Sequence, residues 1–390
     1  MIRVGDFRIG EEEIRAINKV LDSGRISEGP VVREFEQEWA KYIGTKYAVA
    51  VNSGTSALIV GIRALKELGY IKAKNVITTP ISYVATSNAV VLNQMEPVFV
   101  DIETQNFSIS PRYMKSLLKE AGSSSYSLIL PVHLMGYPCN MKEINEIAEE
   151  YGLVVMEDSA QAHGTCYMGK KLGSLSKLST FSFYIAHNIQ AGELGIVNTD
   201  DYEIVRMIKK LKANGRACDC PVCTRNTTGC PKLGKYDSYP RFTHELIGYN
   251  FKTMEFHAAL ALTQLRRAEE IKEHRSENVK YLNDGLEGLD AIQLPVYNED
   301  VSYLAYPIVC KDIDRKKLTT QLESKGIETR PLFGSIPSQP AYKFLGNKYK
   351  GKLPNAEHVG ANGFYIGCHQ YLTQDDLEYI IKTFREVLKR

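Results

Sequence analysis

The sequence predicts an α/β protein with a mostly parallel sheet and a smaller C-terminal α+β domain. Between about residues 46 and 200, short β-branched or apolar runs alternate with longer segments of helical periodicity, as in β-α-β units. Residues 253–285 then form a long amphipathic segment, and strand and helix signals resume after it. We therefore expect a large domain over residues 1–252, followed by a linking helix and a small domain over residues 253–390.

The individual elements follow in order along the chain. Predicted strands are KYAVAV, NVITTP, PVFVDI, SLILPV and GLVVMED, and predicted helices include residues 56–68 and 141–151. In open parallel sheets, ligands bind beyond the carboxyl ends of the strands. The side chains that follow predicted strands are therefore the first candidates for a site: Ser53, Gly54, Thr55, Asp158 and Gln161.

Length and charge exclude several classes of protein. A chain of 390 residues has room for two or three domains, and 44% hydrophobic residues are ordinary for a globular protein. The formal net charge of +2 gives no general case for binding nucleic acid or an anionic membrane. The first residues lack the apolar run of a signal peptide, and no stretch is long enough for a membrane helix, so we expect a cytoplasmic protein.

Two motifs at strand ends could bind a cofactor. In VNSGTSAL, small residues lie between a strand and a helix, where backbone N–H groups suit a phosphate, although the same residues also make a routine turn and helix N-cap. In MEDSAQAHG, Asp158 ends an apolar strand. A carboxylate there could pair with the protonated ring nitrogen of pyridoxal phosphate, or it could simply cap a helix.

A third motif is a cluster of cysteines in the irregular segment 214–245. Four of the eight cysteines fall within thirteen residues there, in the spacing C-x-C-x2-C-x6-C: Cys218, Cys220, Cys223 and Cys230. Thiolates are preferred ligands of iron–sulfur clusters and of zinc, and long loops are usually functional or held by a ligand. An iron–sulfur cluster, a structural zinc ion and unligated thiols are the three alternatives.

The order of the motifs resembles the sugar aminotransferase (DegT/DnrJ/EryC1/StrS) family of pyridoxal-phosphate enzymes of fold type I. The resemblance covers nearly the whole chain, through SGTSAL, PVHLMGYP, MEDSAQAHG, STFSFY, GYNFKTMEFHAALALTQL and GIETRPLF. It implies a substrate class, nucleotide-linked keto-sugars, and a homodimer as the functional unit. It also implies a set of site residues: Gly54, Thr55 and Ser182 for the cofactor phosphate, Tyr83 for ring stacking, Asp158 for the ring nitrogen, Gln161 near the ring hydroxyl, Asn250 for the phosphate of the neighbouring subunit, and His133 and Arg330 for the sugar nucleotide.

One position departs from the aminotransferases of this family. Their Schiff-base lysine follows the FSF run, where this chain has FSFYIAHNIQAGELG, with His187 in the place of the lysine and no lysine anywhere from 178 to 204. An imidazole forms no stable imine with an aldehyde, but it moves protons near neutral pH. A catalytically silent relative is one explanation, although the residues implied for cofactor binding are retained.

The histidine resembles a subgroup of the family, the nucleotide-4-keto-6-deoxyhexose 3-dehydrases. Its members use pyridoxamine phosphate, and their histidine takes a proton from the cofactor. One variant recycles the cofactor with glutamate, and the other holds a [2Fe-2S] cluster fed by a reductase. The cysteine segment favours the second variant, with an electron-donating reductase or ferredoxin as partner. Two departures leave the cluster type open, because the remote cysteine ligand of those enzymes matches Ala160 and the spacing to the last cysteine is longer.

Overall fold

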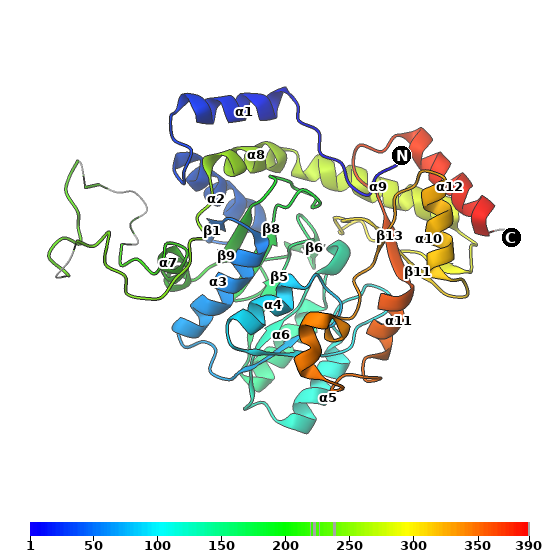
Figure 1. Cartoon of the computed structure of the whole chain (residues 1–390), viewed down its shortest axis with the longest axis horizontal. Helices are drawn as coiled ribbons and strands as arrows, with labels where there is room; N and C mark the ends of the chain where they lie inside the picture. Colours follow the sequence, from blue (N-terminus) through cyan, green and yellow to red (C-terminus); the bar gives the residue numbers. More distant parts are fainter. Residues whose placement is uncertain (219, 221–223, 226, 237–238, 389–390) are drawn as a thin grey trace.

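The computed structural model describes residues 1–388 except 219, 221–223, 226 and 237–238. In that part of the chain, a large sheet has the strand order β1-β9-β8-β5-β4-β2-β3, and a smaller sheet has the order β10-β11-β13-β12 (Figure 1). The strands of the large sheet are β1 (Tyr47–Val51), β2 (Asn75–Thr78), β3 (Glu96–Phe99), β4 (Tyr126–Leu130), β5 (Val154–Asp158), β8 (Leu178–Ser182) and β9 (Gly195–Thr199).

The five predicted strands of the large sheet are confirmed, and the structure adds β8 and β9. Neighbouring strands from β3 to β8 run parallel, whereas β9 pairs antiparallel with both β8 and β1. This arrangement confirms the mostly parallel α/β sheet. It also brings the carboxyl ends of β1, β5 and β8 to one edge, where ligands bind in such sheets.

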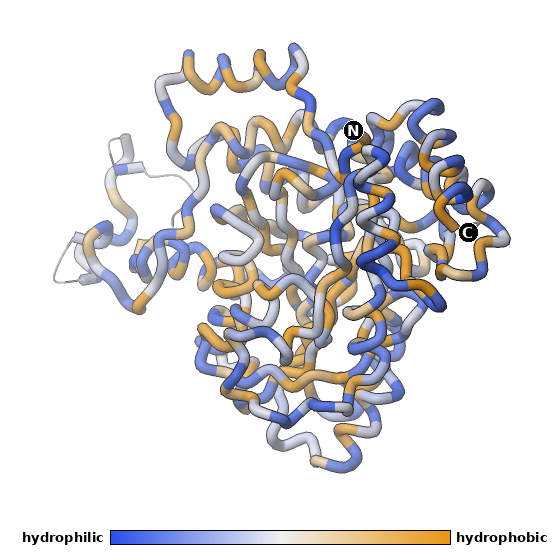
Figure 2. The backbone as a smooth tube through the Cα atoms, turned by 45° about the vertical axis from the view of Figure 1, so that its right-hand side comes forward, coloured by the Kyte–Doolittle hydropathy of each residue, from blue (hydrophilic) through white to orange (hydrophobic). Residues whose placement is uncertain are grey.

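Helices cover both faces of the large sheet. On one face, Val49 and Val197 pack in an apolar core with α3 (Gly54–Glu67), α4 (Ala85–Leu92) and α7 (Tyr202–Leu211). On the other face, strand side chains pack with α2 (Pro30–Ile43) and α8 (Glu255–Arg266), or with α5 (Pro111–Ala121) and α6 (Met141–Tyr151). The near-continuous apolar strands are typical of a sheet buried on both sides, and Figure 2 shows stretches of hydrophobic colour through the middle of the molecule.

The single long helix expected over 253–285 is two helices. After α8, Arg267 leaves the helical region with φ −105° and ψ 11°, and α9 (Ala268–Leu286) begins at the next residue. The Arg267 guanidinium forms an ion pair with Glu13 of α1 (Glu11–Asp22), the helix that packs along α8. Amphipathic periodicity continues across the break, which is why the sequence pattern predicted one helix.

The C-terminal part contains the smaller sheet. Its strands are β10 (Ile292–Gln293), β11 (Tyr306–Cys310), β12 (Arg330–Pro331) and β13 (Gly363–Ile366), and its helices are α10 (Arg315–Ser324), α11 (Pro354–Asn362) and α12 (Gln374–Leu388). Short elements complete the chain: β6 (Cys166–Tyr167), β7 (Lys170–Lys171) and the 3₁₀ turns Leu134–Gly136, Ile336–Ser338 and Pro340–Leu345. The apolar core of this part includes Val132 and Met135 from the large-sheet region, and the division at residue 252 stays a prediction.

The cysteine-bearing segment projects from the body of the molecule beside α7 (Figure 1). Its two ends meet in a narrow neck. There Arg216 and His244 form an isolated antiparallel β-bridge, and the Ala217 N–H donates to the Thr243 carbonyl at 2.9 Å. Between these ends, the described residues form turns and irregular structure, as the composition predicts. Among the described residues, no helix is both long and apolar enough to cross a membrane.

Candidate active site

The first part of the candidate site is the amino end of α3. The Ser53 hydroxyl caps the helix by accepting from the Ser56 N–H at 3.1 Å, so the N-cap alternative is correct for that residue. Gly54 follows and lies against Ser182 at the end of β8, where a Cβ added at Gly54 would come within 2.4 Å of the Ser182 Cβ. Gly54, Thr55 and Ser182 thus lie around one helix amino terminus, a geometry suited to an anion.

Asp158 occupies the end of β5 and is 4% exposed. Its carboxylate accepts from the Thr86 hydroxyl at 2.7 Å and from the Ala160 N–H at 3.2 Å. A turn follows the strand, so the alternative that Asp158 caps a helix is wrong. Burial raises the pKa of Asp158, and the hydrogen bonds from Thr86 and Ala160 act in the opposite direction. The carboxylate is therefore a buried acceptor that a cationic ring nitrogen would stabilise.

Gln161 and Tyr83 lie on segments near this carboxylate. The Gln161 side-chain oxygen accepts from the Met135 N–H at 2.8 Å, which fixes the direction of the amide. Tyr83 precedes α4, and its ring is 61% exposed with one edge contact to Phe333 at 6.2 Å. An exposed aromatic ring beside a buried carboxylate offers a stacking surface for a planar ligand.

His187 lies in the loop that joins β8 to β9. Its backbone N–H donates to the Tyr184 carbonyl at 2.9 Å, and its half-buried ring lies 6.2 Å from the Tyr184 ring. Burial lowers the pKa of His187 to about 4. A hydrogen bond with the Ser182 backbone acts to raise this pKa, and the positive charge of Arg275 acts to lower it. The imidazole is therefore neutral at pH 7 and able to accept a proton.

His163 packs behind His187 in an aromatic cage. Its ring is 2% exposed, lies 5.7 Å from Trp39 and 5.2 Å from Phe183, and lies 5.9 Å from the ring of His187. Neither ring nitrogen has a hydrogen-bond partner in the described part of the chain. Burial lowers the pKa of His163 well below its usual value, so it is a neutral neighbour of His187.

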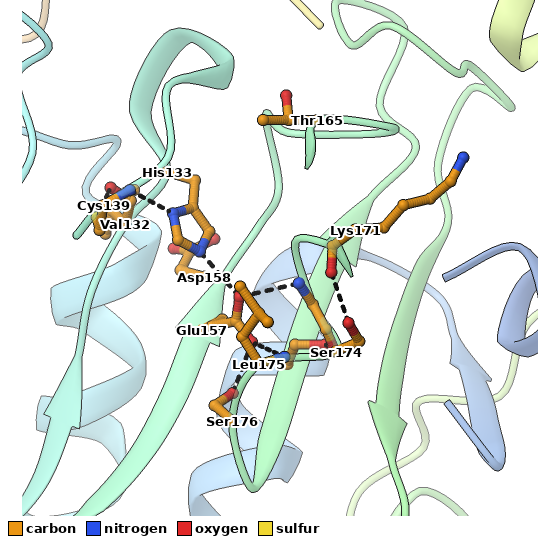
Figure 3. A network of polar contacts seen from close by, with 12 residues as sticks. Val132, His133, Cys139, Glu157, Asp158, Thr165, Lys171, Ser174, Leu175 and Ser176 are labelled. Atoms are coloured by element: carbon orange, nitrogen blue, oxygen red, sulfur yellow. Dashed lines mark hydrogen bonds and ion pairs between the residues drawn. The ribbon is translucent and has the colours of Figure 1, made fainter. Parts of the chain in front are cut away.

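His133 is part of a buried network with Glu157, the residue that precedes Asp158 on β5 (Figure 3). Its Nε2 contacts the Glu157 carboxylate at 3.0 Å, and its Nδ1 accepts from the Cys139 N–H at 3.1 Å. Glu157 also accepts from the Gly173 N–H and from the Ser176 hydroxyl. The side chain of His133 is fully buried, and its assignment to the sugar-nucleotide pocket stays a prediction.

Arg330 and Asn250 are exposed, and their ligand-binding roles also stay predictions. Arg330 donates to the neighbouring Glu328 at 3.0 Å. Asn250 pairs with Ala213 in an isolated bridge at the base of the cysteine segment, and its side-chain oxygen accepts from Lys252 at 2.6 Å. This contact leaves the amide nitrogen of Asn250 directed to other acceptors.

The cysteine segment can be compared with its prediction only in part. Cys218, Cys220 and Cys230 are half-buried thiols, and Cys223 lies outside the described residues. Within the described chain, no three histidine, cysteine or carboxylate side chains are gathered as they would be around a metal ion. Of the four cysteines outside the segment, Cys139, Cys310 and Cys368 are buried, as is usual for packing residues, and Cys166 is half-buried.

Several functional neighbours were not predicted from the sequence. Thr86 and Glu157 adjoin Asp158 through space or along the strand, and Arg275 reaches the site from α9. Of these, only Glu157 could have been predicted from the sequence. It adjoins Asp158 on a buried strand, so its side chain points to the other face of the sheet, and a buried carboxylate there needs hydrogen-bond donors. Thr86 and Arg275 are far from the motifs in sequence.

The buried histidines predict a pH-dependent stability. Burial lowers the pKa of His369, which is 3% exposed, to about 4, below the usual unfolded value near 6.5. The unfolded chain therefore binds more protons below pH 6.5, and stability falls as the pH drops from about 6.5 toward 4. We expect His369 alone to cost about 1–2 kcal/mol between pH 7 and pH 5, measured by denaturant unfolding. His369→Gln should reduce this slope, whereas a slope equal to that of the exposed control His274→Gln would contradict the assignment.

Comparisons with known proteins agree with this fold. Residues 8–385 match the model of the DegT/DnrJ/EryC1/StrS aminotransferase family. The chain is 33% identical to the dTDP-4-dehydro-2,6-dideoxy-D-glucose 3-dehydratase of Saccharopolyspora spinosa, over 98% of this chain and 88% of that protein. It is 30% identical to the GDP-4-keto-6-deoxy-D-mannose 3-dehydratase of Escherichia coli, over 97% and 96% of the two chains.

The solved structures include an E. coli GDP-4-keto-6-deoxy-D-mannose-3-dehydratase with bound hydrated PLP. It superposes with a TM-score of 0.87 at 28% identity, and the match covers 98% of this chain and 99% of that one. Together with the family match over nearly the whole sequence, this likeness confirms the fold expected from the motifs. The chain has the pyridoxal-phosphate fold type I and belongs to the DegT/DnrJ/EryC1/StrS aminotransferase family.

Proposed function

We propose that the protein is a pyridoxamine-phosphate-dependent enzyme that removes the C3 hydroxyl of a nucleotide-linked 4-keto-6-deoxyhexose. The observation that carries this proposal is His187 at the position of the family's Schiff-base lysine, with the other cofactor-binding residues retained. Relatives named as 3-dehydratases of nucleotide-linked sugars support the substrate class. A primary amine at position 187 would favour aminotransfer, and an imidazole favours proton transfer.

The residues of the site fit the cofactor. Gly54 packs directly against Ser182 at the amino end of α3, so the Ser182 hydroxyl and the helix N–H groups would lie together around a phosphate, and the buried Asp158 carboxylate suits a protonated ring nitrogen. Thr55, Tyr83 and Gln161 would complete the contacts to the phosphate, the ring face and the ring hydroxyl. When bound as pyridoxamine phosphate, the cofactor supplies an amine for the C4 ketone and an electron sink for the charge that develops.

His187 would act as the base for the single proton transfer. Its neutral imidazole would accept a proton at the C4′ carbon of bound pyridoxamine phosphate and would return it to the departing C3 hydroxyl, which could then leave as water. Asp158 would stabilise the positive charge on the ring nitrogen. Net replacement of the hydroxyl by hydrogen consumes two electrons and two protons, so the complete reaction needs an external reductant.

We propose that the cysteine segment holds an iron–sulfur cluster that relays these electrons singly from a reductase or ferredoxin. The neck of the segment supports this assignment by position. Asn214 at its base donates to the Tyr249 carbonyl at 2.7 Å, and the Phe251 carbonyl accepts from Asn52 at 3.0 Å, one residue before the cap of α3. The thiols therefore project from a base that adjoins the proposed phosphate site. Their ligand set would be Cys218, Cys220, Cys223 and Cys230.

The remaining parts of the proposal concern the assembly and the substrate. A homodimer would let Asn250 reach the phosphate bound by the neighbouring subunit, and the exposed Arg330 would contact the sugar nucleotide. His133 is fully buried against Glu157, so it would affect the substrate through the loop that carries it. Measuring the mass in solution of the wild type and of Asn250→Ala, with cofactor affinity for both, tests the assembly and the role of Asn250 separately.

Metal analysis tests the electron relay. We expect protein purified without oxygen to contain iron with matching acid-labile sulfide, because thiolates are the ligands of such clusters. Cys220→Ser should lower iron at least several-fold and abolish reductase-dependent turnover while pyridoxamine phosphate still binds. Cys310→Ala, which removes a buried thiol of β11, is the matched control. Zinc without sulfide in the wild type would overturn the relay.

A second candidate is a cluster-free 3-dehydratase that glutamate recycles, with a structural zinc ion in the cysteine segment. It is favoured by one observation, that Ala160 stands where the cluster-bearing enzymes have their remote cysteine ligand, while four clustered thiolates serve zinc equally well. Turnover that depends on glutamate and needs no reductase would establish this alternative. Failure to bind pyridoxamine phosphate would instead indicate a silent member of the family.

A further inference from the structure

Arg275 is a buried cation whose neighbours are neutral. It lies on α9, is 2% exposed, and donates to the carbonyl oxygens of Tyr303 at 3.1 Å and Leu304 at 2.8 Å, and to the side-chain oxygen of Gln370 at 3.2 Å. Among the ion pairs of the described residues, none joins Arg275 to a carboxylate. A buried charge without a counter-ion is costly, and its field is poorly screened.

The segment that Arg275 binds also supports the candidate base. Asn188, the residue after His187, donates to the Ser302 carbonyl at 3.1 Å and to its hydroxyl at 2.8 Å. The next two residues of that segment supply the carbonyls that Arg275 holds. Arg275 therefore holds residues 303 and 304 in place, and the adjoining Ser302 is the residue to which Asn188 is hydrogen-bonded.

The same segment reaches the loop that orients Gln161. The Leu304 N–H donates to the Met135 carbonyl at 3.1 Å, and the Met135 N–H donates to Gln161. Ser302 approaches this loop so closely that a Cβ at Gly136 would lie 2.2 Å from the Ser302 carbonyl oxygen. Residues 302–304 thus connect Arg275 with both the proton acceptor and the side chain expected near the cofactor ring.

The charge of Arg275 acts on the histidines around it. Among the described residues, the Tyr184 ring and the neutral His163 ring lie against the His187 ring, and the positive charge of Arg275 lowers the His187 pKa, with burial the larger cause. Arg275 also lowers the pKa of His163 and of His369, with burial the larger cause in each. Burial is thus the main cause of the lowered pKa of all three imidazoles, and the charge of Arg275 acts in the same direction on each, whereas Asp6 opposes it at His369.

We propose that Arg275 is a positioning residue for His187: it holds the 302–304 segment, to which the neighbouring Asn188 is hydrogen-bonded, and it places a positive charge on the His187 side of the fold. The inference rests on the proposed function for the role of His187 as a base. Its two parts are separable. The hydrogen bonds set where the ring lies, and the charge sets the pH range in which the ring can accept a proton.

The test is a titration of His187 by side-chain NMR of protein carrying ¹³C-labelled histidine, assigned with His187→Asn. We expect Arg275→Met to move the His187 midpoint up by roughly 0.5–1 pH unit, because the repelling charge is gone. Gln370→Glu should move it in the same direction with the fold preserved, since a carboxylate of the same shape then neutralises the guanidinium. Arg275→Lys keeps the charge and should leave the midpoint near the wild-type value.

Arg315→Met is the matched control, because Arg315 also donates to two carbonyls, those of Gly360 and Gly363. It should not move the midpoint. Unchanged His187 midpoints in both Arg275→Met and Gln370→Glu would overturn the electrostatic part. The positioning part predicts that Arg275→Lys lowers kcat of C3 deoxygenation about 10- to 100-fold with a wild-type pH profile, and an unaltered kcat would overturn it.

The titration is independent of turnover. If the midpoints shift as expected but the wild type deoxygenates no keto-sugar, the proposed function fails and the electrostatic coupling stands. If the wild type is active and the midpoints do not shift, the inference fails and the proposed function stands. Should Arg275→Met not fold, the Gln370→Glu variant alone decides the electrostatic part.

Discussion

Replacement of His187 by asparagine is expected to lower the rate of C3 deoxygenation by about 10²–10⁴-fold, the usual contribution of a positioned general base. Asparagine has a similar size and can keep the loop conformation, but it cannot accept a proton at neutral pH. Binding of pyridoxamine phosphate should be nearly unchanged, because the proposed phosphate and ring contacts come from other residues. The measurement is a single-turnover assay of the keto-sugar with prebound cofactor.

His187→Lys separates the role of the base from loss of the ring. A primary amine at this position should attach covalently to pyridoxal phosphate, detectable as a mass increase after borohydride reduction, and should suppress deoxygenation. His274→Asn, a change at an exposed histidine of α9, is the control and should behave as wild type. Undiminished deoxygenation in the asparagine variant would refute the assignment of His187 as the base.

Replacement of Asp158 by asparagine is expected to cost roughly 10²–10³ in kcat, similar to the loss of one preorganised electrostatic group. The neutral amide cannot hold a positive charge on the ring nitrogen, so the electron sink weakens even if the cofactor stays bound. The absorbance of the bound cofactor reports the protonation of that nitrogen without any turnover. A variant with wild-type absorbance and kcat would show that Asp158 does not pair with the ring.

Thr86 provides a graded companion to this experiment. Its hydroxyl bonds the Asp158 carboxylate at 2.7 Å inside the protein, and hydrogen bonds to charged groups contribute about 1.5–3 kcal/mol. Thr86→Val should therefore cause a smaller loss than Asp158→Asn, whereas Thr86→Ser, which keeps the hydroxyl, should retain most activity. The order of the three variants distinguishes a positioning role for Thr86 from mere packing.

Much of the fold could be predicted from local patterns, and its exceptions have clear physical causes. Five strands and the α6 helix follow from periodicity, because a sheet buried on both faces has nearly continuous apolar strands. The break at Arg267 could not be predicted, since the amphipathic pattern continues across it from α8 into α9. The antiparallel direction of β9 likewise leaves no mark in its own sequence.

The candidate site was predictable where residues adjoin strand ends and not where they act across the fold. Asp158 and Gly54 follow buried strands, so the carboxyl-edge rule finds them. The partners that set their chemistry, such as Thr86 and Arg275, come from helices whose own sequences carry only packing patterns. Burial also alters proton affinity, and the low pKa of His187 depends on a neighbourhood that only the folded chain assembles.

The narrow neck of the cysteine segment has an evolutionary consequence. Because Ala217 and Thr243 already meet through a backbone hydrogen bond, a chain that joined these two points directly would leave the sheet and the α3 cap where they are. The segment can thus be acquired, lengthened or discarded by descent as one unit, with little effect on the ancestral scaffold. Under the proposed function, the segment that would carry the electron relay and the loop that carries His187 are separate stretches of the chain, so either can be altered without displacing the other.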